Sequence, residues 1–317
     1  MKGVFLDLET TDAGDIDFTG LRQTLPDWDF HALTGPAQMQ DRLKNAAIAV
    51  SNKAVLDRFA LASAKQLKLV CIAATGTNNV DLDAARELGI GVCNVVHYAT
   101  PSVVQHVFGL VFALGSRILQ YHQAVQAGRW QLSPHFSMLD FPIRELAGKT
   151  MGIVGYGELG RGVARAAECF GMKVLVAQRP GGAPQAGRLA LQEILPRVDV
   201  LSLHCPLTDE TRNLIGRDEL KLMKAYALLI NTARGGIVNE EALVEALRNN
   251  EIGGAGIDTL TTEPPANGNP LLDYSSPNLI VTPHTAWASR EARQRLIDGV
   301  AANIRSFLAG SLTNRVA

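Results

Sequence analysis

The stretch Thr150-Met151-Gly152-Ile153-Val154-Gly155-Tyr156-Gly157-Glu158-Leu159-Gly160 decides the fold of the second half of this chain. Its apolar run predicts a strand, its glycines predict a tight turn, and the residues from Gly162 to Ala167 predict a helix. In this pattern the first glycine allows the turn, the second lets the backbone approach a pyrophosphate, and the third packs helix on strand. Free N–H groups at the helix start attract the anion. The stretch predicts a dinucleotide-binding site, and its mid-chain position leaves room for another domain upstream.

The composition fits a protein of about two domains that handles small molecules. The chain has 317 residues, of which 47% are apolar, so each domain can bury a core. It has 30 basic and 31 acidic residues and no long run of either sign, which argues against nucleic acid or an anionic membrane as its partner. The N-terminus lacks the shape of a signal peptide and no apolar run is long enough to span a bilayer, so we expect a cytoplasmic protein.

The cysteines do not have the spacing of a metal site, and no bound metal is expected. A disulfide framework is not expected in a chain of this size with scattered cysteines. Two of the four lie in strand-like apolar runs and are interpreted as core residues. The four are Cys71, Cys93, Cys169 and Cys205.

Strand-like and helix-like segments alternate along the whole chain, which predicts an α/β fold of two doubly wound parallel-sheet domains. In the first part, strands are predicted at Lys2–Leu8, Trp28–Leu33, Ala46–Ser51, Leu67–Ala74 and Gly91–Val96, with helices such as Pro36–Asn45 and Asp81–Leu88. This sheet resembles a flavodoxin-like domain. Six further strands, the full Rossmann number, are predicted at Thr150–Gly155, Lys173–Ala177, Val198–Leu203, Ala227–Asn231, Ala255–Thr259 and Leu279–Thr282.

Two long helices bear on the domain organisation. Pro101–Gln126 is apolar on more than one face, which indicates either a core helix between domains or a subunit interface. Ser289 predicts the start of a last helix that runs from Arg290 to Leu308 and packs back on the first domain. The expected division is therefore a substrate domain of residues 1–98 plus 286–317 and a Rossmann domain of residues 99–285.

Three strand ends in the second sheet deliver chemically suitable side chains. In open parallel sheets, ligands bind outside the carboxyl ends of the strands. The fourth strand leads to Arg234, the fifth to Glu263 and the sixth to His284. An arginine can hold a carboxylate, a histidine can donate a proton to a carbonyl oxygen, and a glutamate can orient that histidine. Together these groups would serve the reduction of a keto acid by a nicotinamide hydride, although each alone could be an ordinary solvated or structural residue.

The chain resembles the D-isomer-specific 2-hydroxyacid dehydrogenase family over nearly its whole length. The resemblance implies that Arg234, Glu263 and His284 are catalytic, and that the amides of Thr75, Gly76 and Thr77 bind the substrate carboxylate together with Arg234. The motifs that carry it are Gly155–Gly160, Asn231–Gly236, Gly256-Ile257-Asp258, Glu263-Pro264-Pro265 and Pro283–Trp287. The cofactor-binding residues expected on this pattern are Thr100, Gly155, Gly157, Glu158, Leu159, Gly160, Gln178, Arg179, Cys205, Pro206, Thr232 and Asp258.

Within that family the linker segments are similar to those of bacterial glycerate dehydrogenases, also called hydroxypyruvate reductases. The similar pieces are Gly128-Arg129-Trp130, Phe136 and Pro142–Lys149. Formate dehydrogenases carry Gln where Glu263 stands, so that branch is disfavoured. The remaining histidines are less informative: His204 could line the cofactor's path or cap its strand, and no partner can be assigned to His97, His106, His122 or His135.

One position departs from the pattern of NAD-preferring members. Those members have an acid at the end of the second Rossmann strand, where it bonds the adenosine ribose. This chain has Gln178 followed by Arg179. The missing carboxylate removes repulsion of a 2′-phosphate and the arginine can bind one, so we hypothesise that NADP is accepted and preferred over NAD. The alternative is that Arg179 points into solvent while Gln178 bonds the ribose hydroxyls.

The sequence therefore predicts NAD(P)H-dependent reduction of a small 2-keto acid, hydroxypyruvate or glyoxylate, to the D-2-hydroxy acid, and the reverse oxidation. The alternative is a nucleotide-sensing, corepressor-like binding protein without turnover. Family likeness also suggests a homodimer formed through Pro101–Gln126.

Overall fold

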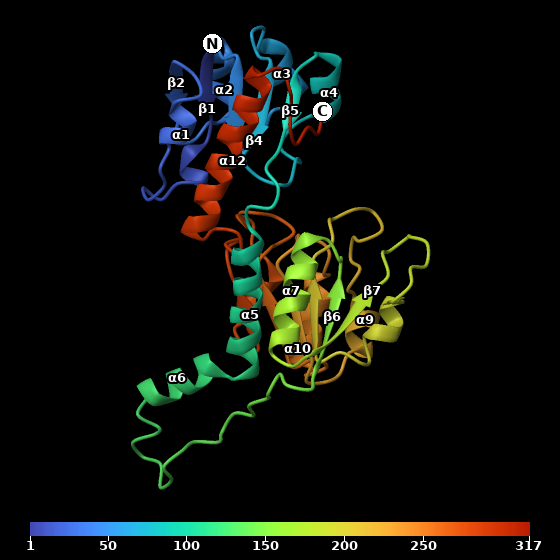
Figure 1. Ribbon diagram of the computed structural model, residues 1–317. Coiled ribbons are helices and arrows are strands. Elements are labelled where there is room, and N and C mark those ends of the chain that lie inside the picture. The colour runs from blue at the N-terminus through green and yellow to red at the C-terminus, as the bar shows by residue number, and fades with distance from the viewer. The chain divides into compact units, whose positions relative to one another are not determined.

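The computed structural model describes all 317 residues, and the chain divides into two compact units. Unit 1 comprises Met1–Ala99 and Trp287–Ala317, and unit 2 comprises Thr100–Ala286. Each unit is built on one sheet in which every pair of neighbouring strands is parallel. The predicted α/β fold with two doubly wound domains is therefore confirmed (Figure 1).

The sheet of unit 1 has the strand order β2-β1-β3-β4-β5, which is the flavodoxin-like order. Its strands are β1 Lys2–Phe5, β2 Asp27–Phe30, β3 Ile48–Ser51, β4 Leu69–Ile72 and β5 Gly91–Cys93. Its helices are α1 Thr19–Arg22, α2 Pro36–Leu43, α3 Arg58–Ser63, α4 Leu82–Glu87 and α12 Arg290–Leu308, with a 3-10 turn at Leu8–Thr10.

Two cores cover the two faces of this sheet, as the alternation along a strand requires. Val70 and Ile72 of β4 belong to one core, whereas Leu69 and Cys71 belong to the other. The second core also contains the inner face of α12, which packs against β4. Cys71 and Cys93 are both buried there as free thiols, with their sulfur atoms 3.4 Å apart, in agreement with their interpretation as core residues.

The sheet of unit 2 has the order β12-β11-β10-β9-β6-β7-β8, a Rossmann arrangement with one strand added at the β12 edge. Its strands are β6 Thr150–Val154, β7 Lys173–Ala177, β8 Arg188–Leu189, β9 Val200–Leu203, β10 Leu228–Asn231, β11 Gly254–Ile257 and β12 Leu279–Val281. Its helices are α5 Thr100–Gly115, α6 Ile118–Gln126, α7 Glu158–Cys169, α8 Leu191–Ile194, α9 Arg217–Leu222, α10 Glu240–Arg248 and α11 Pro270–Asp273.

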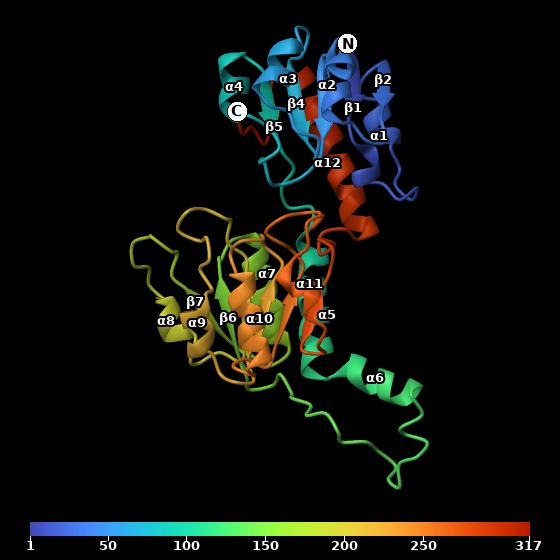
Figure 2. The same ribbon diagram turned by 180° about the vertical axis from the view of Figure 1, so that it is seen from behind.

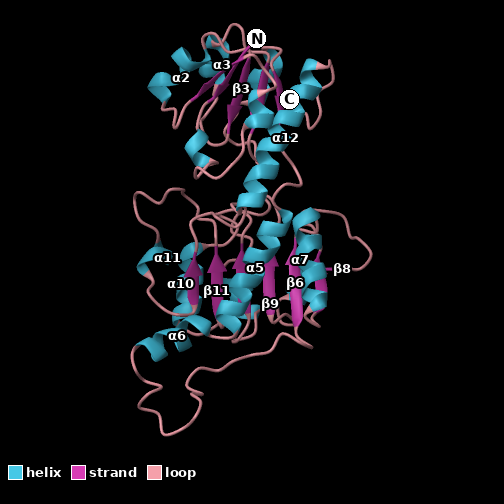
Figure 3. Ribbon diagram, turned by 60° about the vertical axis from the view of Figure 1, so that its left-hand side comes forward, coloured by secondary structure: helices cyan, strands magenta, loops and turns pink.

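Helices cover both faces of this sheet. α5 and α7 lie side by side on one face, and α9 and α10 lie on the other, as the two opposite views show (Figures 1 and 2). Small residues let α5 approach closely: a Cβ atom on Gly256 would come within 3.0 Å of Leu110, and one on Gly162 would come within 3.0 Å of Thr100 and Val104. In Figure 3 the strands stand side by side and run in one direction, so their carboxyl ends share one edge of the sheet.

Three sequence-based expectations need correction. The predicted helix Pro101–Gln126 is two helices, because Arg117 adopts a left-handed conformation (φ 53°) and bends the chain by 57° between α5 and α6. The sheet of unit 2 has seven strands where six were predicted; the strand that was missed is β8, whose two residues are too few to form a recognisable pattern. Most predicted strands also extended beyond the observed ones, because apolar residues continue into buried loops such as Ala73-Ala74.

α6 and the segment that follows it form an arm that projects from the rest of unit 2 (Figures 1 and 3). We define the arm as residues 118–143. Its large apolar side chains are unusually exposed: Leu132, Phe136 and Leu139 are between 86% and 91% exposed. No single helix of the chain could cross a membrane by its length and hydropathy; only α5 and α6 taken together, across their bend, meet that criterion.

Candidate active site

The glycine turn between β6 and α7 has the conformation that its sequence predicts. Gly155 has φ +88°, and a Cβ atom there would lie 2.5 Å from the backbone of His204. A Cβ atom on Gly160 would lie 2.1 Å from the carbonyl oxygen of Gly155. Only Gly157 faces open space, and it is the N-cap residue of the twelve-residue helix α7. Two glycines are therefore required by the protein's own packing, while the third leaves the helix start open to a ligand.

This turn fits the pyrophosphate of a dinucleotide. The N-terminus of α7 offers unpaired N–H groups and the positive end of a helix dipole. Glu158, in the first turn of α7, accepts a hydrogen bond from the Thr100 hydroxyl, and Leu159 follows it. At the end of β10 the Thr232 hydroxyl is buried without a hydrogen-bond partner in the protein, as expected of a group that a ligand would satisfy.

A cavity of about 270 Å³ lies beyond the end of β7, where the adenosine end of a dinucleotide would bind. Arg179, Cys205, Pro206 and Glu210 line it. Burial raises the pKa of the Cys205 thiol to about 11, so this cysteine stays protonated and unreactive. The amide nitrogen of Gln178 is already engaged, because Nε2 donates to the carbonyl of Gly182 (2.9 Å). The pKa of Glu210 lies below its usual value. The hydrogen bond from the Thr208 hydroxyl is the largest cause, and the charge of Arg179 makes a smaller contribution in the same direction.

Asn231, at the end of β10, fixes the loop that carries Arg234. It is buried; its Oδ1 accepts from the N–H of Ala233 (3.0 Å) and its Nδ2 donates to the carbonyl of Arg234 (2.9 Å). The Arg234 guanidinium donates from Nη1 to the carbonyl of Ala233 (2.7 Å) and pairs with no carboxylate. Its remaining donors are available to a substrate anion.

His284 and Glu263 form a pair at the same edge of the sheet. The Nδ1 atom of His284 lies 2.6 Å from Oε2 of Glu263, and the other carboxylate oxygen accepts the N–H of Leu260 (2.8 Å). His284 has φ 54°, and its N–H donates to the carbonyl of Asp258 (2.8 Å). The pair is partly exposed and borders an apolar cavity of about 420 Å³. The Nε2 atom of His284 is not used by Glu263 and can face a reacting group.

The carboxylate of Asp258 is buried and fully engaged by the protein. It accepts hydrogen bonds from the Thr282 hydroxyl (2.5 Å) and from the N–H groups of Thr285 (2.9 Å) and Ala286 (3.0 Å). His106, on α5, lies 3.0 Å from the same hydroxyl and 3.5 Å from the carboxylate. The sequence did not indicate a partner for His106. A single histidine on an otherwise apolar helix does not show that its side chain lies near the ends of β11 and β12.

His204 is a partly buried residue directly after β9. Its Nε2 pairs with the Ser202 hydroxyl (2.9 Å), and its Nδ1 is buried without a partner. Burial lowers its pKa to about 4, so the ring is neutral at physiological pH.

In unit 1, two side-chain hydrogen bonds hold the loop after β4. The Thr75 hydroxyl donates to the carbonyl of Val95 (2.9 Å), and Asn94 donates to the carbonyl of Thr75 (2.7 Å). The backbone N–H groups of Thr75, Gly76 and Thr77 form none of the backbone hydrogen bonds of the protein. Groups of this kind bind anions.

Comparison with known proteins identifies the family. Residues 108–286 match the family model described as the NAD binding domain of D-isomer specific 2-hydroxyacid dehydrogenases. A glycerate dehydrogenase of Methylorubrum extorquens is 46% identical over 99% of this chain and 98% of its own. The chain belongs to the D-isomer-specific 2-hydroxyacid dehydrogenase family.

Other members of the family extend the likeness. A hydroxypyruvate reductase of Blautia hydrogenotrophica is 36% identical over the full length of this chain and 99% of its own. Among solved structures, an acyclic imino acid reductase in complex with NADPH and D-Arg is 28% identical and superposes with a TM-score of 0.87 over all of both chains. As a family member this chain is an NAD(P)-binding dehydrogenase, and its dinucleotide-binding domain lies in unit 2.

Proposed function

We propose that this enzyme reduces a small 2-keto acid, hydroxypyruvate or glyoxylate, to the corresponding D-2-hydroxy acid and also catalyses the reverse oxidation. The observation that carries the proposal is the 2.6 Å contact between His284 and Glu263, at the strand ends that also present Arg234. Relatives named glycerate dehydrogenase, hydroxypyruvate reductase and glyoxylate reductase support this choice of substrate.

His284 would be the acid of the reduction. A bound nicotinamide supplies the hydride that adds to the carbonyl carbon. Negative charge then develops on the carbonyl oxygen, and His284 would donate the proton from Nε2 to that oxygen. Glu263 holds Nδ1 and would stabilise the charged ring before the transfer. In the oxidative direction the neutral ring accepts the hydroxyl proton.

Arg234 and the loop 75–77 would bind the substrate carboxylate. The guanidinium offers a planar fork without a competing acid, and the loop offers three free N–H groups. We therefore assign substrate binding to unit 1, through Thr75, Gly76 and Thr77, and dinucleotide binding to unit 2, with the boundaries of these domains near residues 99 and 286.

The test replaces the acid and keeps the fold. His284→Ala should lower kcat by about a hundredfold to ten-thousandfold, because a positioned general acid contributes about 10² to 10⁴. NADPH binding, measured by fluorescence titration, should stay within about twofold. Glu263→Gln should lower kcat and shift its pH profile. Retained turnover in His284→Ala would contradict the catalytic role, and no turnover of any 2-keto acid by the wild-type protein would favour the corepressor-like alternative.

We also propose that NADP(H) is the preferred dinucleotide. β7 ends without an acid, and Arg179 lines the cavity that would receive a 2′-phosphate. The solved imino acid reductase relative binds NADPH. The preference is tested by comparing kcat/KM for the two cofactors; an equal or higher value with NADH than with NADPH would contradict it.

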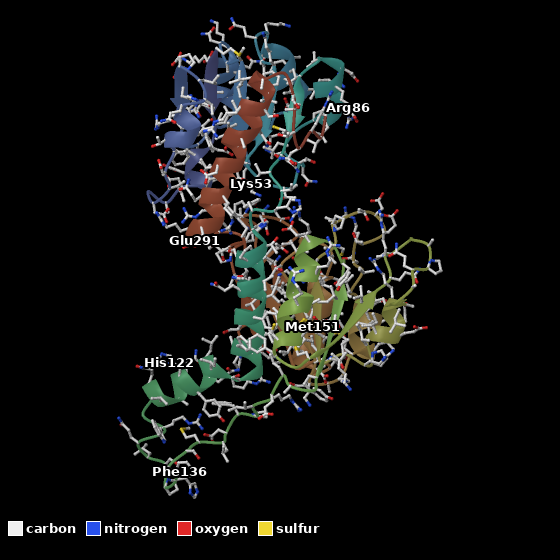
Figure 4. The ribbon with its side chains drawn as sticks, in the orientation of Figure 1. Lys53, Arg86, His122, Phe136, Met151 and Glu291 are labelled. Atoms are coloured by element: carbon white, nitrogen blue, oxygen red, sulfur yellow. The ribbon has the colours of Figure 1, made fainter.

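We propose that two copies of the chain form a homodimer through the arm. We also propose that the protein is cytoplasmic. Figure 4 shows Phe136 at the far end of the arm, away from the body of unit 2. Exposed apolar side chains of this size are costly in water and mark an interaction site. Because α5 packs within unit 2, we assign the subunit interface to α6 and the arm rather than to the whole of Pro101–Gln126.

A further inference from the structure

A third cavity, of about 400 Å³, lies at the opposite edge of the unit 2 sheet from Arg234 and His284. It is bordered by the residues that start strands β9 and β10, by the bend between α5 and α6, and by the segment 142–149. Strands β9 to β12 are parallel, so their amino ends meet here while their carboxyl ends meet at the candidate active site. The cavity is therefore separate from the site of hydride transfer.

Three cationic side chains line this cavity: Arg117, Arg144 and Lys149. The Arg117 side chain has no hydrogen bond or ion pair within the protein. Burial, and secondarily the charge of Arg144, lower its pKa, and both guanidinium-bearing residues line the same cavity. An arginine remains charged under such conditions, so the partly buried Arg117 carries a charge that no acidic side chain compensates, and the exposed Arg144 adds a second positive charge to the cavity. The Arg144 guanidinium carbon lies 4.2 Å from the ring centre of Tyr226, which fixes its plane.

The acidic residues of the cavity do not neutralise these cations. Asp199 is already used: its Oδ1 lies 3.0 Å from the Lys224 amine and its Oδ2 accepts the N–H of Thr150 (2.7 Å). Glu145 also borders the cavity but forms no ion pair with the three cations. Lys224 adds another positive charge near Tyr226, with its amine 5.7 Å from the ring centre.

The backbone at Arg117 adds an independent observation. Its φ of 53° and ψ of 34° lie in the left-handed region, which side chains other than glycine, asparagine and aspartate rarely adopt. Arginine has no local means of stabilising this conformation. Such strained positions cluster at ligand and functional sites. Here the conformation creates the bend at which the guanidinium meets the cavity.

We propose that this cavity is a binding site for a small organic acid that carries a multiply charged oxyanion group, either a phosphate or adjacent carboxylates. The guanidiniums of Arg117 and Arg144 and the amine of Lys149 bind the oxyanion, since planar guanidinium forks match such groups bidentately. Leu114, Leu146 and Ile252 line the same cavity and accommodate the apolar part of the ligand.

The experiment titrates the full-length protein, saturated with NADPH, with inorganic phosphate and separately with citrate, at constant ionic strength, by isothermal calorimetry. Arg117→Asn removes the charge and keeps the bend, because asparagine tolerates the left-handed conformation. Arg165→Gln, on the exposed face of α7, is the matched control for loss of one positive charge.

We expect saturable binding of at least one of the two anions, weakened about tenfold or more by Arg117→Asn and within about twofold of wild type in Arg165→Gln. Stronger binding of phosphate than citrate would identify a phosphorylated ligand, and the reverse would identify a polycarboxylate. Absence of binding to the wild-type protein would overturn the proposal and leave the cavity to another occupant, such as an acidic side chain of a second copy. Binding that Arg117→Asn does not weaken would place the anion elsewhere and would also overturn it.

Discussion

The carbonyl oxygen of Leu260 occupies the space that a side chain on Gly235 would need: a Cβ atom there would come within 1.9 Å of it. Gly235 follows Arg234 in the loop after β10, and Leu260 lies in the loop after β11, where its N–H is bound by Glu263. The absent side chain therefore lets the two loops touch. Through this contact the position of Arg234 is linked to that of the His284–Glu263 pair.

Gly235→Ala should separate these loops. We expect kcat/KM to fall about a hundredfold, because displacements near 1 Å at a reacting centre cost that much. The free energy of unfolding should fall by about 1–3 kcal/mol from overpacking. Steady-state kinetics and urea unfolding measure the two effects. Gly109→Ala is the control, since its Cβ would meet nothing within 4 Å and it lies inside α5, where alanine favours helix. Full activity in Gly235→Ala would show that the loops adjust freely.

Glu210 is expected to weaken the binding of a 2′-phosphate. Its carboxylate lies in the cavity that Arg179 also lines, and the two are close enough to influence each other. Glu210→Gln should raise kcat/KM for NADPH about threefold to tenfold and leave that for NADH nearly unchanged, because it removes repulsion of the phosphate alone. Arg179→Ala should act in the opposite direction, with a loss of at least about tenfold for NADPH. Equal changes for both cofactors in either variant would place the 2′-phosphate elsewhere.

The fold was largely predictable because its inner strands, such as β9 and β10, are buried on both faces. Apolar runs such as Val200–Leu203 and Leu228–Asn231 cannot be anything but inner strands of a parallel sheet once they alternate with helical segments. The break at Arg117 was not predictable, since neither its own type nor that of Ser116 disfavours a helix strongly. It depends on packing between the end of α5 and the segment around Arg144, which are distant in the sequence.

The candidate site was predictable to the extent that strand ends locate it. The Rossmann pattern fixes the order of the three strands that precede Arg234, Glu263 and His284. It therefore predicts that all three residues lie at the carboxyl edge of the sheet. His106 and Glu210 were not found, because each lies on an element whose position relative to the strand ends is set by tertiary packing. Gln178 illustrates the same limit: the sequence did not indicate that its Nε2 donates to the carbonyl of Gly182, and its contact with a ribose stays a prediction.

Protonation of His204 should contribute to acid lability. Its folded-state pKa is about 4, below the ordinary value of 6.5, because burial opposes the charged form. Above pH 6.5 both states are neutral and stability is unaffected. Between pH 6.5 and 4 the unfolded state takes up a proton that the folded state refuses, so the free energy of unfolding falls as the pH falls, by about 2 kcal/mol in this window.

Urea unfolding of the cofactor-free protein at pH 7 and pH 4.5 measures this contribution. His204→Gln keeps a polar side chain beside Ser202 and should remove about 2 kcal/mol of the pH-dependent loss. His122→Gln, on the exposed surface of α6, should leave the loss unchanged (Figure 4). Identical pH dependence in His204→Gln and the wild-type protein would mean that the ring is hydrated in the folded state.

The arm should hold two copies of the chain together. Phe136 is 91% exposed, and burying an aromatic anchor of this kind at an interface contributes about 2–4 kcal/mol. Phe136→Asp should therefore weaken dimerisation about a hundredfold and shift the mass measured by light scattering at micromolar concentration towards the 34.0 kDa of one chain. Phe59→Asp is the matched control, because Phe59 is 72% exposed on α3 of unit 1, outside the arm. A wild-type mass of one chain, or a dimer unaffected by Phe136→Asp, would show that these side chains are exposed for another reason.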